Sequence, residues 1–116
     1  MPIQDAVERV SNFDEVTYGY EVADTLRECE RCLYCPEPAC IASCPVAIDI
    51  PGFIKKISAK DYRGAYDVIS ETNLLPAICG RVCPQEDQCE GVCPVGDTLK
   101  PVARSPTHRS SRKLGQ

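Results

Sequence analysis

The chain has 116 residues and a net charge of −4, and its 43% of apolar residues include nine cysteines and no tryptophan. A conventional hydrophobic core is therefore thin in a chain that is only long enough for one domain. The seven glycines form neither G-x-G-x-x-G nor a phosphate-binding loop, which excludes a self-contained NAD(P)H or ATP enzyme.

The N-terminal residues do not resemble a secretory signal. Asp5 and Glu8 stand where such a signal needs an uninterrupted apolar run. Asp49 and Pro51 interrupt the most apolar region well short of the roughly 18 residues that a membrane-spanning helix requires. We therefore expect a cytoplasmic protein with no membrane partner. Because thiols stay reduced in the cytoplasm, dense cysteine there indicates metal binding more than a disulfide framework.

The first third of the chain predicts an arm followed by a helix. Residues 1–20 show no sustained apolar pattern and are expected to form an N-terminal arm, extended or with a short helix. From Val22, apolar residues recur four, three and four positions apart as far as Leu33. This spacing is typical of one helix face, and it predicts a helix that ends at Cys32.

Two further helices and several short turns are expected downstream. The segment 50–57 begins with Ile-Pro-Gly, which suits a helix start, and then places Phe53, Ile54 and Ile57 on one side. A helix over about 61–73 would also face apolar residues inward. Shorter helical turns are predicted over 39–44, 76–83 and 85–93. Because no segment shows sustained strand alternation, the sequence predicts an all-α fold.

The cysteines form two groups, and their spacing is the strongest signal in the chain. The groups are Cys29-x2-Cys32-x2-Cys35-x4-Cys40-x3-Cys44-Pro45 and Cys79-x3-Cys83-Pro84-x4-Cys89-x3-Cys93-Pro94. Thiolates separated by two residues can bind one metal or one cluster corner, and in two-cluster ferredoxins the fourth cysteine of such a run binds the other cluster. Proline after three of the cysteines stops a helix from running past a ligand. The pattern favours iron–sulfur clusters.

Structural zinc is the leading alternative to iron–sulfur clusters, and disulfides are a third possibility. Zinc sites commonly pair C-x2-C knuckles about a dozen or more residues apart, and the second cysteine group contains no C-x2-C. Nine cysteines would nevertheless fit two zinc sites with one thiol left over. A zinc-stabilised structural or interaction module without a redox role therefore stays open at this point.

Three segments of the chain resemble a known family. They are ERCLYCPEPACIASCPVAIDIPGFI (30–54), RVSNFDEVTYGY (9–20) before it, and ICGRVCPQEDQCEGVCP (78–94) after it. Together they resemble the N-terminal iron–sulfur region shared by the glutamate synthase small subunit, the large subunit of NADH-dependent ferredoxin:NADP oxidoreductase, and dihydropyrimidine dehydrogenase. The resemblance covers about residues 7–103. It implies short helices and loops wrapped around two [4Fe-4S] clusters, an alpha-helical ferredoxin-like fold, over residues 21–103.

The resemblance also implies a division of the cysteine ligands between the clusters. The first cluster would be bound by Cys32, Cys35, Cys40 and Cys93. The second would be bound by Cys44, Cys83 and Cys89, and its fourth ligand in the family is a carboxylate or an amide. Each cluster would thus take ligands from both cysteine groups, so that cluster assembly is coupled to folding.

The fourth ligand of the second cluster is where the sequence departs from the family. After Pro101-Val102-Ala103, the family continues into a helix that carries the ligand, whereas this chain continues with RSPTHR, and His108 falls where the ligand would sit. Histidine can ligate iron–sulfur centres, so His108 is one candidate. Solvent or a partner residue are others. Cys29 and Cys79 match family positions that are not ligands and are interpreted as packing thiols, with Cys79 a substitute if the usual ligand is missing.

Charge and resemblance together suggest a function. Residues 104–116 hold four bases and no acid, which predicts a flexible basic tail. The rest of the chain holds nine of the 13 bases and all 17 acids, a net charge of −8, which disfavours nucleic-acid binding. The resemblance implies an electron-transfer module that is not catalytic alone. It would relay electrons between an FAD- and NAD(P)H-binding flavoprotein subunit or domain and a further redox partner.

Overall fold

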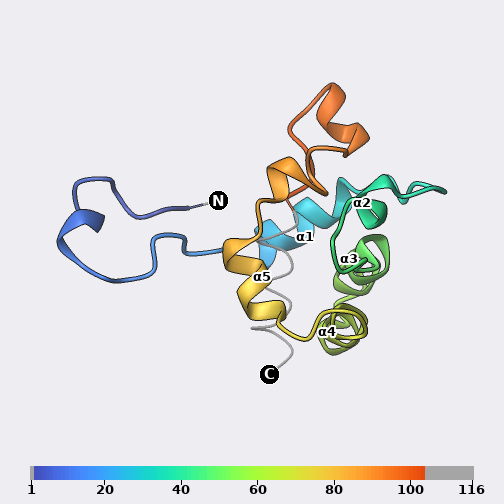
Figure 1. The fold of residues 1–116 in the computed structure, drawn as a ribbon, viewed down its shortest axis with the longest axis horizontal. Helices are drawn as coiled ribbons and strands as arrows, with labels where there is room; N and C mark the ends of the chain where they lie inside the picture. The colour runs from blue at the N-terminus through green and yellow to red at the C-terminus, as the bar shows by residue number, and fades with distance from the viewer. Residues whose placement is uncertain (1, 104–116) are drawn as a thin grey trace.

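The computed structural model describes residues 2–103, which form short helices joined by loops (Figure 1). The α-helices are α1 (Val22–Glu30), α2 (Ala39–Ala42), α3 (Ile50–Ser58), α4 (Tyr62–Ser70) and α5 (Pro76–Val82). The 3-10 turns are η1 (Arg9–Ser11), η2 (Gln85–Asp87) and η3 (Pro94–Asp97). Extended pairing in this part of the chain consists of one isolated antiparallel bridge, between Ile3 and Thr17. The predicted all-α fold is confirmed.

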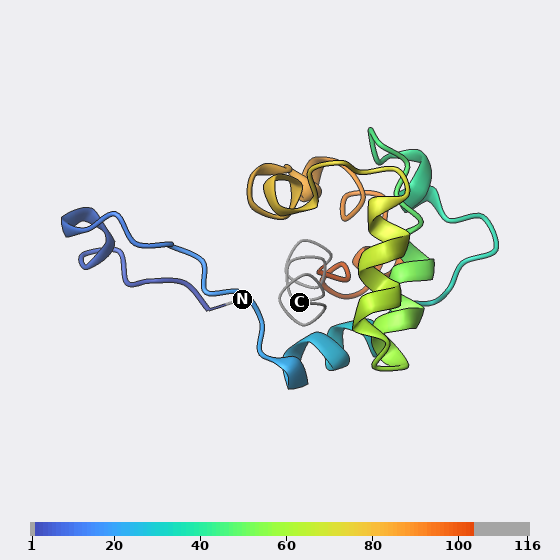
Figure 2. The ribbon, with the colours of Figure 1, turned by 90° about the horizontal axis from the view of Figure 1, so that it is seen from below.

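The helix α3 lies beside α4 and carries much of the core (Figure 2). Each helix begins at an aspartate whose side chain accepts a backbone N–H three residues on. Asp49 accepts from Gly52 at 3.0 Å, and Asp61 accepts from Gly64 at 2.9 Å. Such caps satisfy backbone donors that have no partner within the helix. The side chains of Phe53, Ile54 and Ile57 are buried, as the sequence predicted.

The helix α1 ends earlier than its apolar spacing predicted. It stops at Glu30, and Leu33 is 64% exposed instead of continuing the buried face. The C-cap residue Arg31 still has helical backbone angles, and the chain reaches the left-handed region only at Tyr34, with a φ of 49°. Cys29 is fully buried on α1, while Cys32 lies in the loop after the helix.

The N-terminal residues extend away from the helices (Figures 1 and 2). Within this arm, Gln4 N–H donates to the Val16 carbonyl at 2.7 Å. Phe13 is fully exposed. An ion pair of 2.9 Å between Glu15 and Arg81 joins the arm to α5.

The hydrophobic core of the described residues is small and contains cysteine. Besides the apolar side chains of α3 and α4 it includes Cys29, Cys40, Cys89 and Cys93. None of the described helices has the length and apolar character needed to cross a membrane. His108 and the rest of 104–116 lie outside the described residues.

Candidate iron–sulfur centres

Two cavities in the described part of the chain are each lined by four cysteines. The first, of about 20 Å³, is lined by Cys32, Cys35, Cys40 and Cys93. The second, of about 140 Å³, is lined by Cys44, Cys79, Cys83 and Cys89. Each cavity therefore combines three cysteines of one group with one cysteine of the other, so segments far apart in the sequence meet at both.

The first cavity is enclosed by apolar residues from four segments. Its cysteines come from the loop after α1, from α2, and from the residue before η3. Pro51 at the start of α3 and Val102 near the end of the described chain complete the wall. No charged side chain lines this cavity. Its volume is close to the roughly 10–15 Å³ that one water needs.

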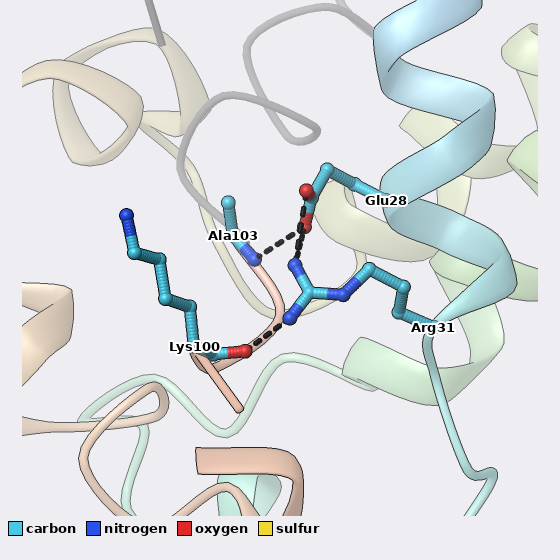
Figure 3. Close-up of polar contacts among 4 residues, drawn as sticks. All are labelled: Glu28, Arg31, Lys100 and Ala103. Carbon is cyan, nitrogen blue, oxygen red and sulfur yellow. Dashed lines mark hydrogen bonds and ion pairs between the residues drawn. The ribbon is translucent and has the colours of Figure 1, made fainter. Parts of the chain in front are cut away.

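A polar clamp holds the last described segment against α1 (Figure 3). Arg31 Nη1 contacts both carboxylate oxygens of Glu28, at 2.7 and 3.0 Å, and Arg31 Nη2 donates to the carbonyl of Lys100. The Ala103 N–H donates to Glu28 Oε2 at 3.2 Å. Between the two fastened residues lies Val102, which is fully buried. The clamp therefore keeps one wall of the first cavity in place.

The second cavity is built on α5 and the loops that face it. Cys79 lies on α5 and Cys83 is the residue at its C-cap, four positions later. Residues at this separation lie on one side of a helix, and the Cys83 N–H donates to the Cys79 carbonyl at 3.2 Å. Cys44 follows α2 and Cys89 follows η2. The helix α3 supplies part of the apolar wall through Ile50 and Phe53.

The pKa of the Cys83 thiol is raised, mainly by burial. The negative charge that Cys79 and Cys44 would carry as thiolates raises this pKa further. The Cys83 thiol donates to Gln88 Oε1 at 3.1 Å. No lysine or arginine lines the cavity, so thiolates here need positive charge from another source. Iron ions would supply it.

The two donor sets fit a cluster better than a single ion. Within residues 2–103, no three histidine, cysteine, aspartate or glutamate side chains are arranged to hold one metal ion. The cysteines instead surround two cavities with largely apolar walls. Sulfur donors around a cavity suit an inorganic cluster of several atoms, whereas zinc would draw four ligands to one point.

The structure brings together the cysteines that the family resemblance assigned to each cluster. The four proposed for the first cluster line one cavity, and Cys44, Cys83 and Cys89 line the other. Cys29 lines neither cavity, and burial raises its pKa to about 12, which agrees with a packing thiol. His108 lies outside the described residues.

The second cavity includes two residues outside the predicted ligand set. Cys79, predicted to be a packing thiol and a substitute if the usual fourth ligand is missing, lines the cavity, and so does Gln88, which the sequence did not single out. Cys79 stands four residues before Cys83 in a segment that was predicted to be helical. Gln88 carried no such signal, since its place depends on how the loop after η2 folds back.

Comparison with known proteins identifies a family and several relatives. The family model for dihydropyrimidine dehydrogenase domain II, 4Fe-4S cluster, matches residues 9–111. The chain is 38% identical over 89 residues to the glutamate synthase [NADPH] small chain of Halomonas elongata, covering 77% of this chain and 19% of that protein. It is 37% identical over 89 residues to the NAD-dependent dihydropyrimidine dehydrogenase subunit PreT of Salmonella typhimurium, covering 77% and 22%.

A further relative has a less specific name. The chain is 39% identical over 93 residues to the putative oxidoreductase UacF of Escherichia coli, covering 79% of this chain and 15% of that protein. The matched region thus spans about a fifth or less of the length of these curated relatives.

Proposed function

The chain belongs to the dihydropyrimidine dehydrogenase domain II family of 4Fe-4S cluster domains, and from this membership we propose that it relays single electrons through two such clusters. The cluster-holding unit would be residues 21–103. Its first cluster would be held by Cys32, Cys35, Cys40 and Cys93. Its second would be held by Cys44, Cys83, Cys89 and a fourth ligand.

One observation carries this proposal. Eight of the nine cysteines divide four and four between two cavities of the described chain, and each set draws on both cysteine groups. A single cluster would leave four of these thiols around an unused cavity. Two clusters use both.

The protein's own part in the chemistry is to bind the clusters and control their surroundings. A bound [4Fe-4S] cluster supplies one-electron redox chemistry at a potential set by ligands, hydrogen bonds and solvent exposure. Apolar side chains such as Val102 and Phe53 line the cavities and would limit the access of water to the clusters. Gln88 offers a hydrogen-bonding group to the sulfur of Cys83. The two environments differ, which would separate the two potentials.

The proposed partners are an FAD- and NAD(P)H-binding flavoprotein subunit or domain and a further redox centre. Two relatives carry NADPH or NAD in their names, and both are much longer than the matched region. The acidic balance of residues 1–103 would suit a basic docking surface. Association through such charges is expected to weaken as salt rises.

Anaerobic loading of the full chain with iron and sulfide tests the proposal. We expect about eight irons and eight sulfides per chain, as two [4Fe-4S] clusters require, and electron paramagnetic resonance of the reduced protein should show two interacting clusters. About four of each, with one cluster signal, would overturn the two-cluster proposal. Colourless protein that binds zinc instead would point to a structural module without a redox role.

A further inference from the structure

We propose that the second cluster of this chain is bound by four thiolates, with Cys79 as the fourth ligand. This inference rests on the proposed function and goes beyond it, because the fourth ligand of the second cluster in the family is a carboxylate or an amide. The observation behind it is that four cysteines line one cavity: Cys44, Cys79, Cys83 and Cys89.

The position of Cys79 on α5 suits a ligand. It precedes Cys83 by four residues, so both sulfurs project from the same side of the helix end. Cys79 is partly exposed at the cavity, unlike Cys29, which is fully buried in the core and lines neither cavity. The two thiols that the family leaves unligated therefore have different surroundings in this chain.

A buried amide beside Cys79 lacks a hydrogen-bond acceptor. Asn73 is 3% exposed, and its Oδ1 accepts from the Leu75 N–H at 2.9 Å and from the Cys79 thiol at 3.7 Å. Its Nδ2 is buried with no partner among the described residues. An unpaired buried donor costs free energy. Asn73 therefore contacts Cys79 through Oδ1 and keeps one buried donor unused beside it.

Gln88 is the competing ligand within the described part of the cavity, because its side chain also lines the wall. Its Oε1 accepts from the thiol of Cys83 at 3.1 Å, which makes it a neighbour of a ligand. Iron–sulfur clusters are held by soft thiolates in preference to amide oxygens. Because the Cys79 thiol is available in the same cavity, we assign Cys79 as the iron ligand. Gln88 keeps its hydrogen bond with Cys83.

The ligation step changes protons but not the redox state. The S–H bond of Cys79 breaks and its proton leaves to solvent, while the sulfur donates an electron pair to the fourth iron in place of a solvent oxygen. The number of electrons on the cluster is unchanged. A fourth thiolate adds negative charge that a neutral ligand would not, so it makes the reduction potential more negative.

The test compares Cys79→Ala with Cys29→Ala in the full chain, both loaded anaerobically. An iron without a protein ligand is lost on mild oxidation, which leaves a [3Fe-4S] cluster with its own paramagnetic resonance signal. We expect this signal and a loss of about one iron in eight from Cys79→Ala. Cys29→Ala should match the unsubstituted chain, because its sulfur lines neither cavity.

A second variant keeps the test decisive if Cys79→Ala fails to load. Cys79→Ser offers an oxygen ligand of similar size, so it should retain four irons in the second cluster while shifting that cluster's potential and spectrum. Unchanged iron, spectrum and potential in both Cys79 variants would overturn the assignment. A three-iron signal from His108→Ala or Gln88→Ala, with none from Cys79→Ala, would also overturn it.

The two proposals fail differently. If the unsubstituted chain binds two clusters and Cys79→Ala behaves like it, only the assignment of Cys79 is wrong. If the unsubstituted chain binds no cluster under the same conditions, the proposed function itself is wrong.

Discussion

The two cysteine-lined cavities have the same kind of donors but different surroundings. The first is small and apolar, and the segment clamped by Glu28 and Arg31 forms part of its wall. The second is larger and includes two glutamine side chains, Gln85 and Gln88. Because solvent access and hydrogen bonds to sulfur tune cluster potentials, identical ligands in these two places would give clusters of different potential. A relay needs such a difference to give electrons a preferred direction.

The largest expected effect comes from substituting Cys93, which lines the first cavity although it belongs to the second cysteine group. Cys93→Ser should replace a thiolate of the first cluster by an oxygen ligand, which changes the spectrum and the stability of that cluster and leaves the second unchanged. Cys44→Ser is the matched variant, and it should change the second cluster instead. Iron analysis with paramagnetic resonance separates the two outcomes. If Cys93→Ser spares the first cluster, the crossed division of ligands is wrong.

Opening the wall of the first cavity should affect one cluster more than the other. Glu28→Gln removes the charge that pairs with Arg31, and the free energy of unfolding should fall by about 1–2 kcal/mol. Oxygen should then bleach the first cluster faster while the second bleaches at an unchanged rate. Asp67→Asn is the control, because its exposed ion pair with Arg63 should contribute less than about 0.5 kcal/mol. Equal acceleration for both clusters would contradict a wall specific to the first cavity.

The N-terminus of α3 should affect both cavities alike, since Pro51 lines the first and Ile50 the second. Asp49→Ala removes the cap of this helix and should cost about 1 kcal/mol of unfolding free energy, measured by urea titration. Asp61→Ala removes the cap of α4, which lines neither cavity, and should cost a similar amount. Only Asp49→Ala should make both clusters more labile. The same lability in Asp61→Ala would show that general loss of stability is responsible.

The last expected effect is a pH dependence of the free energy of unfolding that changes neither cluster. Burial raises the pKa of Cys29 to about 12 from 9.0. Between these values the unfolded chain loses the thiol proton and the folded chain keeps it, so stability present below pH 9 falls as pH rises toward 12. Urea midpoints at pH 8 and pH 10 should therefore fall more for the unsubstituted chain than for Cys29→Ala. Equal falls would show that Cys29 ionises as readily in the folded state.

The local features of the fold were predictable from the sequence. Apolar spacing, together with an aspartate or proline at the start, located α3 and α4, because their caps and buried faces depend on residues within a few positions. The end of α1 was placed two residues too late, at Cys32 instead of Glu30, because the apolar spacing continues past the helix to Leu33. The clamp was also missed, because it joins Arg31 to Lys100 across most of the chain.

The site was predictable as far as the cysteine pattern extended. The family resemblance grouped the cysteines of each cavity, since ligand order along the chain is a local property of the motif. It named Cys79 only as a substitute ligand, because the place of Cys79 beside Cys44 depends on how α5 packs against a distant loop. Tertiary contacts of this kind leave no periodic pattern in the sequence.

Anomalous diffraction at the iron edge, on crystals of the loaded full chain, is the most direct measurement. If each cluster takes thiolates from both cysteine groups, two separate iron sites should appear. One should be bonded to Cys93 together with cysteines of the first group, and the other to Cys44 together with cysteines of the second. A single iron site, or a cluster bonded only by cysteines of one group, would contradict the crossed arrangement.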